Sequence, residues 1–159
     1  MRTLALLILI VLVLAGIGVY YYVRSTGISA LNPPGAVEEY FANHAKHWLV
    51  ARAASGTLPP ETPPTSENAT DGHTQYGSLC AGCHGYDGRT PTRQGNSMSP
   101  RAPSLASHGP QSYSDAELYV VVHDGVRMTG MPGFGNTQSS DQIWNLVHYI
   151  RTLAAAPAH

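Results

Sequence analysis

The stretch Cys80-Ala-Gly-Cys83-His84 contains both cysteines of the chain, and it decides how the rest of the sequence is interpreted. Two thiols separated by two residues can each form a thioether with one vinyl group of a haem, while the imidazole that follows ligates the iron. This spacing is typical of covalent haem attachment. The motif therefore predicts one haem c, bound through Cys80 and Cys83, with His84 as an axial ligand.

Three other interpretations of the motif fit the sequence less well. A zinc site needs four protein ligands, usually with a second Cys/His pair at a defined spacing, and the other histidines form no such pair. A thioredoxin-like redox pair needs a βαβ setting, which the sequence does not predict. A disulfide between the two cysteines would leave His84 without a role. Haem attachment is the favoured prediction.

The sixth ligand of the iron decides between electron transfer and small-molecule chemistry. A methionine thioether favours ferrous iron and raises the potential, whereas an open or displaceable position permits ligand binding. Three methionines follow the motif, Met98, Met128 and Met131. Met131 is the favoured ligand because a proline follows it and glycines surround it, which suits a loop that approaches the haem closely. Met128 is the main rival, and Met98 or a histidine such as His108 are further alternatives.

The N-terminus carries a long apolar run. Residues 4–23 contain no charge, and Tyr20-Tyr21-Tyr22 and Arg24 end the run. Twenty helical residues at ~1.5 Å each cover a hydrocarbon core of roughly 30 Å, and tyrosines suit the interface. We expect residues 1–24 to be a single-pass membrane anchor; a cleaved signal peptide is the alternative. Because haem c is attached outside the cytoplasm, the N-terminus should be cytoplasmic and the haem domain periplasmic.

The segment after the anchor predicts an amphipathic helix over residues 32–54. Asn32 can cap it, and the proline that follows suits the first helical position. One face of this helix is apolar. This face can dock on a partner, pack on the haem domain or lie on the lipid interface, and its members are Val37, Phe41, Ala45 and Trp48.

The remaining sequence predicts an all-α haem domain after a linker. Residues 55–70 are rich in proline and threonine, which favours a semi-extended linker of at most about 50 Å at ~3.1 Å per residue. The haem domain should then cover residues 71–156. It should contain about three main helices plus loops. One runs into the motif from Asp71, and the others follow capping boxes at Ser114 and Ser139.

At these residues the chain resembles the class I cytochrome c family, in particular its membrane-anchored monohaem bacterial members. The resemblance covers residues 71–154. It implies that Met131 is the axial ligand and that the carbonyl of Pro103 accepts the Nδ1–H of His84. It also implies that the first helix of the domain crosses the last one, through Gly72 and Tyr76 against Leu146 and Tyr149. The supporting stretches are Cys80 to Gly85, Tyr86-Asp87-Gly88, Ala102 to Leu105 and Asp124 to Gly135.

These observations predict a redox relay and no enzyme. The chain should carry single electrons between membrane-bound redox complexes of a respiratory or photosynthetic chain, alone or as a subunit of a larger complex. The alternative is a haem enzyme or a gas or peroxide sensor with a displaceable sixth ligand. A net charge of −1 with Lys46 as the single lysine argues against nucleic acid as a partner. The haem domain, which has no lysine, also lacks a basic ring for long-range steering.

Overall fold

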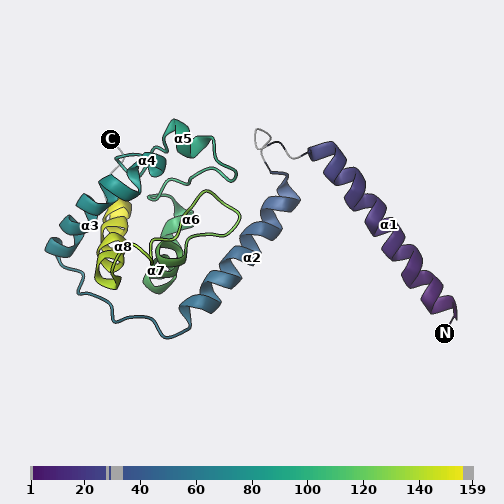
Figure 1. Ribbon diagram of the computed structural model, residues 1–159, viewed down its shortest axis with the longest axis horizontal. Helices are drawn as coiled ribbons and strands as arrows, with labels where there is room; N and C mark the ends of the chain where they lie inside the picture. Colours follow the sequence, from purple (N-terminus) through teal and green to yellow (C-terminus); the bar gives the residue numbers. More distant parts are fainter. Residues whose placement is uncertain (1, 28, 30–33, 156–159) are drawn as a thin grey trace. The chain divides into compact units, whose positions relative to one another are not determined.

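The computed structural model in Figure 1 describes residues 2–27, 29 and 34–155. Every regular element in these residues is a helix, and none of them forms a strand. The predicted all-α class is confirmed. The chain divides into two compact units, Met1–Asn32 and Pro33–His159.

The first unit consists of helix α1, Arg2–Thr26. Its 25 residues extend about 37 Å at ~1.5 Å per residue, which is enough to cross a bilayer. Its mean hydropathy is 2.8, and its leucine, isoleucine and valine side chains are exposed. By length and composition α1 fits a membrane span, and a signal anchor near the N-terminus has the same properties.

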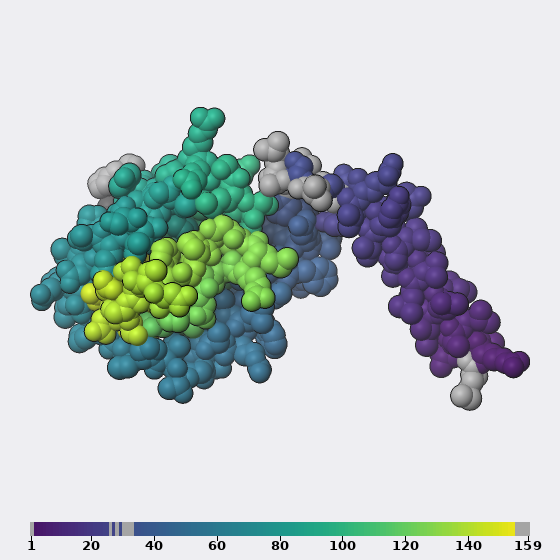
Figure 2. Space-filling view, viewed as in Figure 1, coloured from purple at the N-terminus to yellow at the C-terminus, as the bar shows by residue number. Residues whose placement is uncertain are grey.

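The second unit contains the other helices, of which α3 (Ser66–Leu79) and α8 (Ser140–Ala155) form the centre of the core. The buried side chains come mostly from α3, α7 and α8, and they surround Tyr76 and Leu146. In the space-filling view the C-terminal segment lies directly against α3 (Figure 2). The helices are α2 Ala36–Ala54, α3 Ser66–Leu79, α4 Ala81–His84, α5 Arg93–Asn96, α6 His108–Gln111, α7 Asp115–Asp124 and α8 Ser140–Ala155.

Helices α3 and α8 approach each other closely because α3 has a glycine at the contact. A Cβ atom on Gly72 would overlap the carbonyl oxygen of Asn145. One turn later, the rings of Tyr76 and Tyr149 lie 5.0 Å apart between centroids. The crossing that the family resemblance implied is therefore present, and it brings the end of α3 to the position where the cysteine motif begins.

The two capping boxes predicted from the sequence begin α7 and α8. The hydroxyl of Ser114 accepts a hydrogen bond from the Glu117 amide, and the Glu117 carboxylate accepts one from the Ser114 amide. Ser139 and Gln142 exchange the same pair of bonds, at 3.3 and 2.8 Å. These bonds satisfy amide groups that have no partner within the helix. Both helix starts were thus readable from local sequence.

The segment between α2 and α3 differs from the predicted linker. Helix α3 begins at Ser66, five residues before the predicted start, because the side chain of Thr65 caps it. The preceding chain is fixed to α8, where Nε2 of His148 donates to the carbonyl of Thr62 at 2.8 Å. Leu58 also packs against the core. The boundary between the two compact units lies before α2, not within residues 55–70.

Candidate haem site

Helix α4 and its N-cap residue, Cys80, hold the three residues of the predicted attachment motif within one helical turn. The amides of Cys83 and His84 both donate to the carbonyl of Cys80, at 3.1 and 3.0 Å. Residues three and four positions apart lie on the same side of a helix, so the two thiols and the imidazole share one face. Cys80 is buried, Cys83 is half-buried, and both are free thiols.

The environment of Cys80 favours a neutral thiol. Burial, and to a smaller extent the neighbouring Cys83, raises the pKa of Cys80 to about 12. Disulfide exchange requires the thiolate, which a raised pKa disfavours. Among the described residues there is also no cluster of three or more His, Cys, Asp or Glu side chains that could hold a metal ion. The geometry gives no support to a zinc site or a thioredoxin-like pair.

His84 is oriented by a backbone carbonyl. Its Nδ1 atom lies 2.9 Å from the carbonyl oxygen of Pro103, so Nδ1 carries the proton and Nε2 is left to bind a metal. Burial lowers the pKa of His84, although the hydrogen bond to Pro103 acts in the opposite direction. The imidazole is therefore held neutral, which is the form that ligates iron.

A glycine and a threonine that the sequence analysis did not single out pack against the motif. The Thr92 amide donates to the Cys83 carbonyl at 3.1 Å, and the Thr92 hydroxyl donates to the Gly82 carbonyl at 2.6 Å. Gly95 lies so close that a Cβ there would overlap the Cys83 carbonyl oxygen. The sequence signal that could have identified this contact is a threonine three residues before a glycine, which is the spacing of an N-cap and its amide donor. In the structure the Gly95 amide donates to the Thr92 hydroxyl.

The loop that carries Met131 folds back onto the end of α7. The carbonyl of Met131 accepts a hydrogen bond from the Val126 amide at 3.1 Å, and the Met131 amide donates to the Thr129 hydroxyl at 3.1 Å. Gly133 lies against the backbone of Asp124, where a Cβ would be 2.6 Å from its carbonyl oxygen. The glycines around Met131 are thus needed for a close backbone approach, and they leave the Met131 side chain half-buried.

The other candidate ligands have different surroundings. Met128 is 92 % exposed and has a left-handed backbone with φ of 63°. Met98 is half-buried and lies against the Met131 loop, because a Cβ on Gly130 would be 2.5 Å from its sulfur. His108 is exposed at the start of α6. Within the described residues no hydrogen bond joins Met131 to the cysteine motif, so its ligation to the iron stays a prediction.

The residues present fit haem c by their chemistry. The site offers two free thiols and one imidazole within a single helical turn, with the imidazole tautomer already fixed through Pro103. Two free thiols at this spacing can each add to one vinyl group of a haem, and a neutral histidine with a free Nε2 ligates iron. Cys80, Cys83, His84 and Pro103 are brought together, and Met131 lies on a separate loop that its glycines hold in shape.

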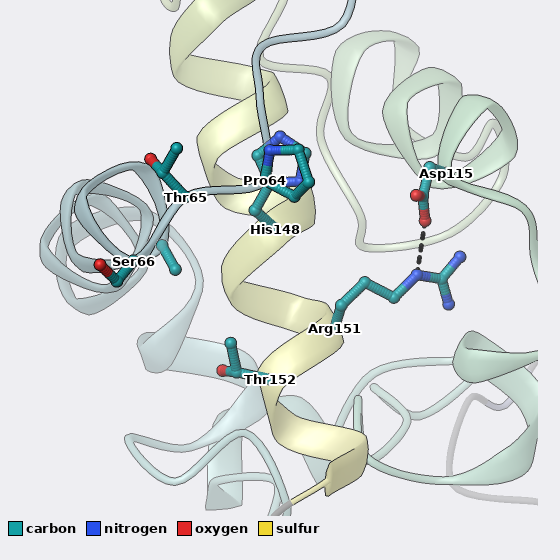
Figure 3. Close-up of a pocket in the computed structure, with 8 residues that line it drawn as sticks. Pro64, Thr65, Ser66, Asp115, His148, Arg151 and Thr152 are labelled. Carbon is teal, nitrogen blue, oxygen red and sulfur yellow. Dashed lines mark hydrogen bonds and ion pairs between the residues drawn. The ribbon is translucent and has the colours of Figure 1, made fainter.

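A separate open pocket of about 390 Å³ lies where α3, α7 and α8 meet, as Figure 3 shows. Its charged groups already have partners. Nε of Arg151 lies 2.6 Å from the Asp115 carboxylate, and another guanidinium nitrogen donates to the Gln111 carbonyl. His148, which also lines the pocket, donates to Thr62. The pocket lies where helices pack against one another, and none of the predicted haem residues lines it.

Comparison with known proteins identifies one family. A family model described as "Cytochrome C oxidase, cbb3-type, subunit III" matches residues 67–150, which is more than half of the chain. No curated protein matches. Among solved structures, a chain of the Kuenenia stuttgartiensis reducing HAO-like protein complex is similar, with a TM-score of 0.54 and 22 % identity. That match covers 62 % of this chain and 49 % of the other, so this chain spans about half its length. The similarity shows the fold.

Proposed function

The chain belongs to the c-type cytochrome family described as cytochrome c oxidase, cbb3-type, subunit III, and on this premise we propose that it is a membrane-anchored monohaem electron carrier. It transfers single electrons between membrane redox complexes on the extracytoplasmic side. The observation that carries the proposal is the attachment turn, in which Cys80, Cys83 and His84 share one face and Pro103 fixes the imidazole. A cytochrome c domain implies covalent haem c.

In this function the protein fixes the position and the protonation state of the residues that would bind the iron. Haem c, when bound, supplies an iron that gains and loses one electron without a bound substrate. The hydrogen bond from His84 to Pro103 fixes the ring orientation, and burial keeps the imidazole neutral. Met131 would hold the iron together with His84, and its thioether would favour the ferrous state and a high potential. Cys80 and Cys83 attach the group permanently.

The membrane anchor determines which partners the haem domain can reach. Helix α1 ends at Thr26 and α2 begins at Ala36, so nine residues separate them. Nine residues extend at most about 30 Å, which is shorter than the reach of a linker over residues 55–70. Tethering on this scale raises the effective concentration toward partners in the same membrane to the millimolar range. Docking then does not need a basic ring, in agreement with the near-neutral charge of the chain.

A ligand-binding experiment tests the proposal against a haem enzyme or a gas or peroxide sensor. The protein, produced with the machinery that attaches haem c, should contain one haem per chain and bind carbon monoxide or cyanide slowly at neutral pH. The Met131→Ala variant is the control, because an open axial position should bind carbon monoxide rapidly. Rapid binding by the unaltered protein would contradict the proposal and support the enzyme or sensor.

A further inference from the structure

One side of helix α2 is packed, and another side carries exposed apolar residues. Val50 is 8 % exposed, Lys46 is half-buried, and the His47 ring stacks on the Tyr113 ring with 4.6 Å between centroids. This side of α2 packs against the region of α7. Burial lowers the pKa of Lys46, which agrees with its position on the packed side.

The opposite side of α2 carries a stripe of large exposed residues, Val37, Phe41 and Trp48. Their exposed fractions are 68 %, 66 % and 63 %. At roughly 100° per residue, these three side chains project within about 40° of one another, and Val50 projects about 200° from Trp48. The sequence left three surfaces open as the partner of this face. The structure excludes the haem domain as the partner of this face, because α2 packs on that domain with its other side.

The chain's connectivity favours the lipid bilayer as the partner of the stripe. The last turns of α1 contain Tyr20 to Tyr22 and Arg24, residue types that gather at the membrane surface. Nine residues separate the end of α1 from the start of α2, and nine residues can extend at most about 30 Å.

The composition of the stripe fits the headgroup region. Tryptophan and phenylalanine on one helix face are typical of interfacial helices. Arg52 lies over the Trp48 ring, with 5.9 Å from its guanidinium carbon to the ring centroid. An arginine at the edge of an apolar stripe can extend its charge toward lipid phosphates while its methylenes stay with the aromatic ring. Glu39 projects to the other side of the helix, away from the stripe.

We propose that the stripe of Val37, Phe41 and Trp48 rests in the headgroup region of the bilayer that α1 spans. Helix α2 then lies between the lipid and the haem domain, and it determines which side of that domain faces the membrane. The haem domain is held in one orientation instead of swinging freely. This inference rests on the proposed membrane anchoring by α1.

Single spin labels on the full haem-loaded chain in phosphatidylcholine vesicles test this placement. Cys80 and Cys83 are consumed by the haem, so one introduced cysteine carries the label. Phe41→Cys and Trp48→Cys report the stripe, and Glu39→Cys and Ala53→Cys are exposed controls on other sides of α2. We expect the ratio of oxygen to nickel-chelate collisions to be several-fold higher at the two stripe positions than at the controls.

A label at Leu9→Cys in α1 separates failure of the inference from failure of the anchor. A lipid-like Leu9→Cys together with stripe positions that match the controls would overturn the inference and leave the anchor standing. A water-like Leu9→Cys would overturn both. Stripe positions that are water-like in vesicles but shielded from both reagents in native membranes would show that a protein covers α2, which also overturns the inference.

Discussion

Gly72 of α3 lies directly against Asn145 of α8, so close that a Cβ atom on the glycine would overlap the asparagine carbonyl oxygen. The Cβ of Tyr149 is also only 3.0 Å from that position. The contact fixes the crossing of the two longest core helices. Because α3 leads into Cys80, the same crossing positions the attachment motif.

Replacing Gly72 tests this dependence. Gly72→Ala should force the helices apart and destabilise the protein by about 1–3 kcal/mol or more, because the atom in the way belongs to the backbone. Gly77→Ala on the same helix is the matched control. A Cβ there meets no atom within 4 Å, so alanine should stabilise α3 by about 0.5–1 kcal/mol. Urea unfolding followed by circular dichroism measures both, and equal effects would contradict the close crossing.

The hydroxyl of Tyr76 makes a second link between the core and the motif. It is fully buried and donates to the Gly85 carbonyl at 2.7 Å. Tyr76→Phe should cost about 1–3 kcal/mol, because the buried carbonyl loses its partner. Tyr86→Phe, at a residue that is 81 % exposed, should change stability by no more than about 0.5 kcal/mol. A smaller loss for Tyr76→Phe than for Tyr86→Phe would exclude this role.

The same tyrosine predicts a dependence of stability on alkaline pH. Burial, more than its charged neighbours, raises the pKa of Tyr76 above the value of about 10 expected in an unfolded chain. The folded state then binds the proton more tightly, so the stabilisation is complete below pH ~10 and falls as the pH rises above it. The urea midpoint should drop between pH 9 and 11. The urea midpoint of the Tyr76→Phe variant should drop less over the same pH range. An equal drop would show that other groups cause the effect.

Removing the anchor tests confinement to the membrane. A chain that begins at Pro34 keeps α2 and its packing against α7, which a chain beginning at Ser66 would lose. We expect the Pro34 form to need a far higher concentration than the full chain to deliver electrons to native membranes. Its rate should depend only weakly on salt, because the haem domain has nearly balanced charge. Equal rates at equal low concentration would show that the tether has no effect.

Local signals in the sequence predicted local structure well. The capping boxes at Ser114 and Ser139 depend on residues three positions apart, and both are present. The structure of residues 55–65 was harder to predict, because their composition suggests a free linker. Their attachment depends on His148, a residue 86 positions from Thr62 that lies beside it only in the fold.

Periodicity also predicted the apolar face of α2 but not what it contacts. The face is defined by spacing along one helix, whereas its partner depends on which side of α2 packs against α7. The buried Val50 settles that question, and the sequence alone does not distinguish it from the exposed Trp48. In the same way, the close approach of Gly95 to Cys83 depends on the path of the chain between them.

The most direct test of this cytochrome assignment is the ferric spectrum of three methionine variants. We expect Met131→Ala to abolish the weak sulfur-to-iron charge-transfer band and to lower the potential. Met128→Ala should keep the band because Met128 is 92 % exposed, and Met98→Ala should keep it because Met98 packs against Gly130. A band that survives in Met131→Ala and disappears in Met128→Ala or Met98→Ala would contradict the ligand assignment.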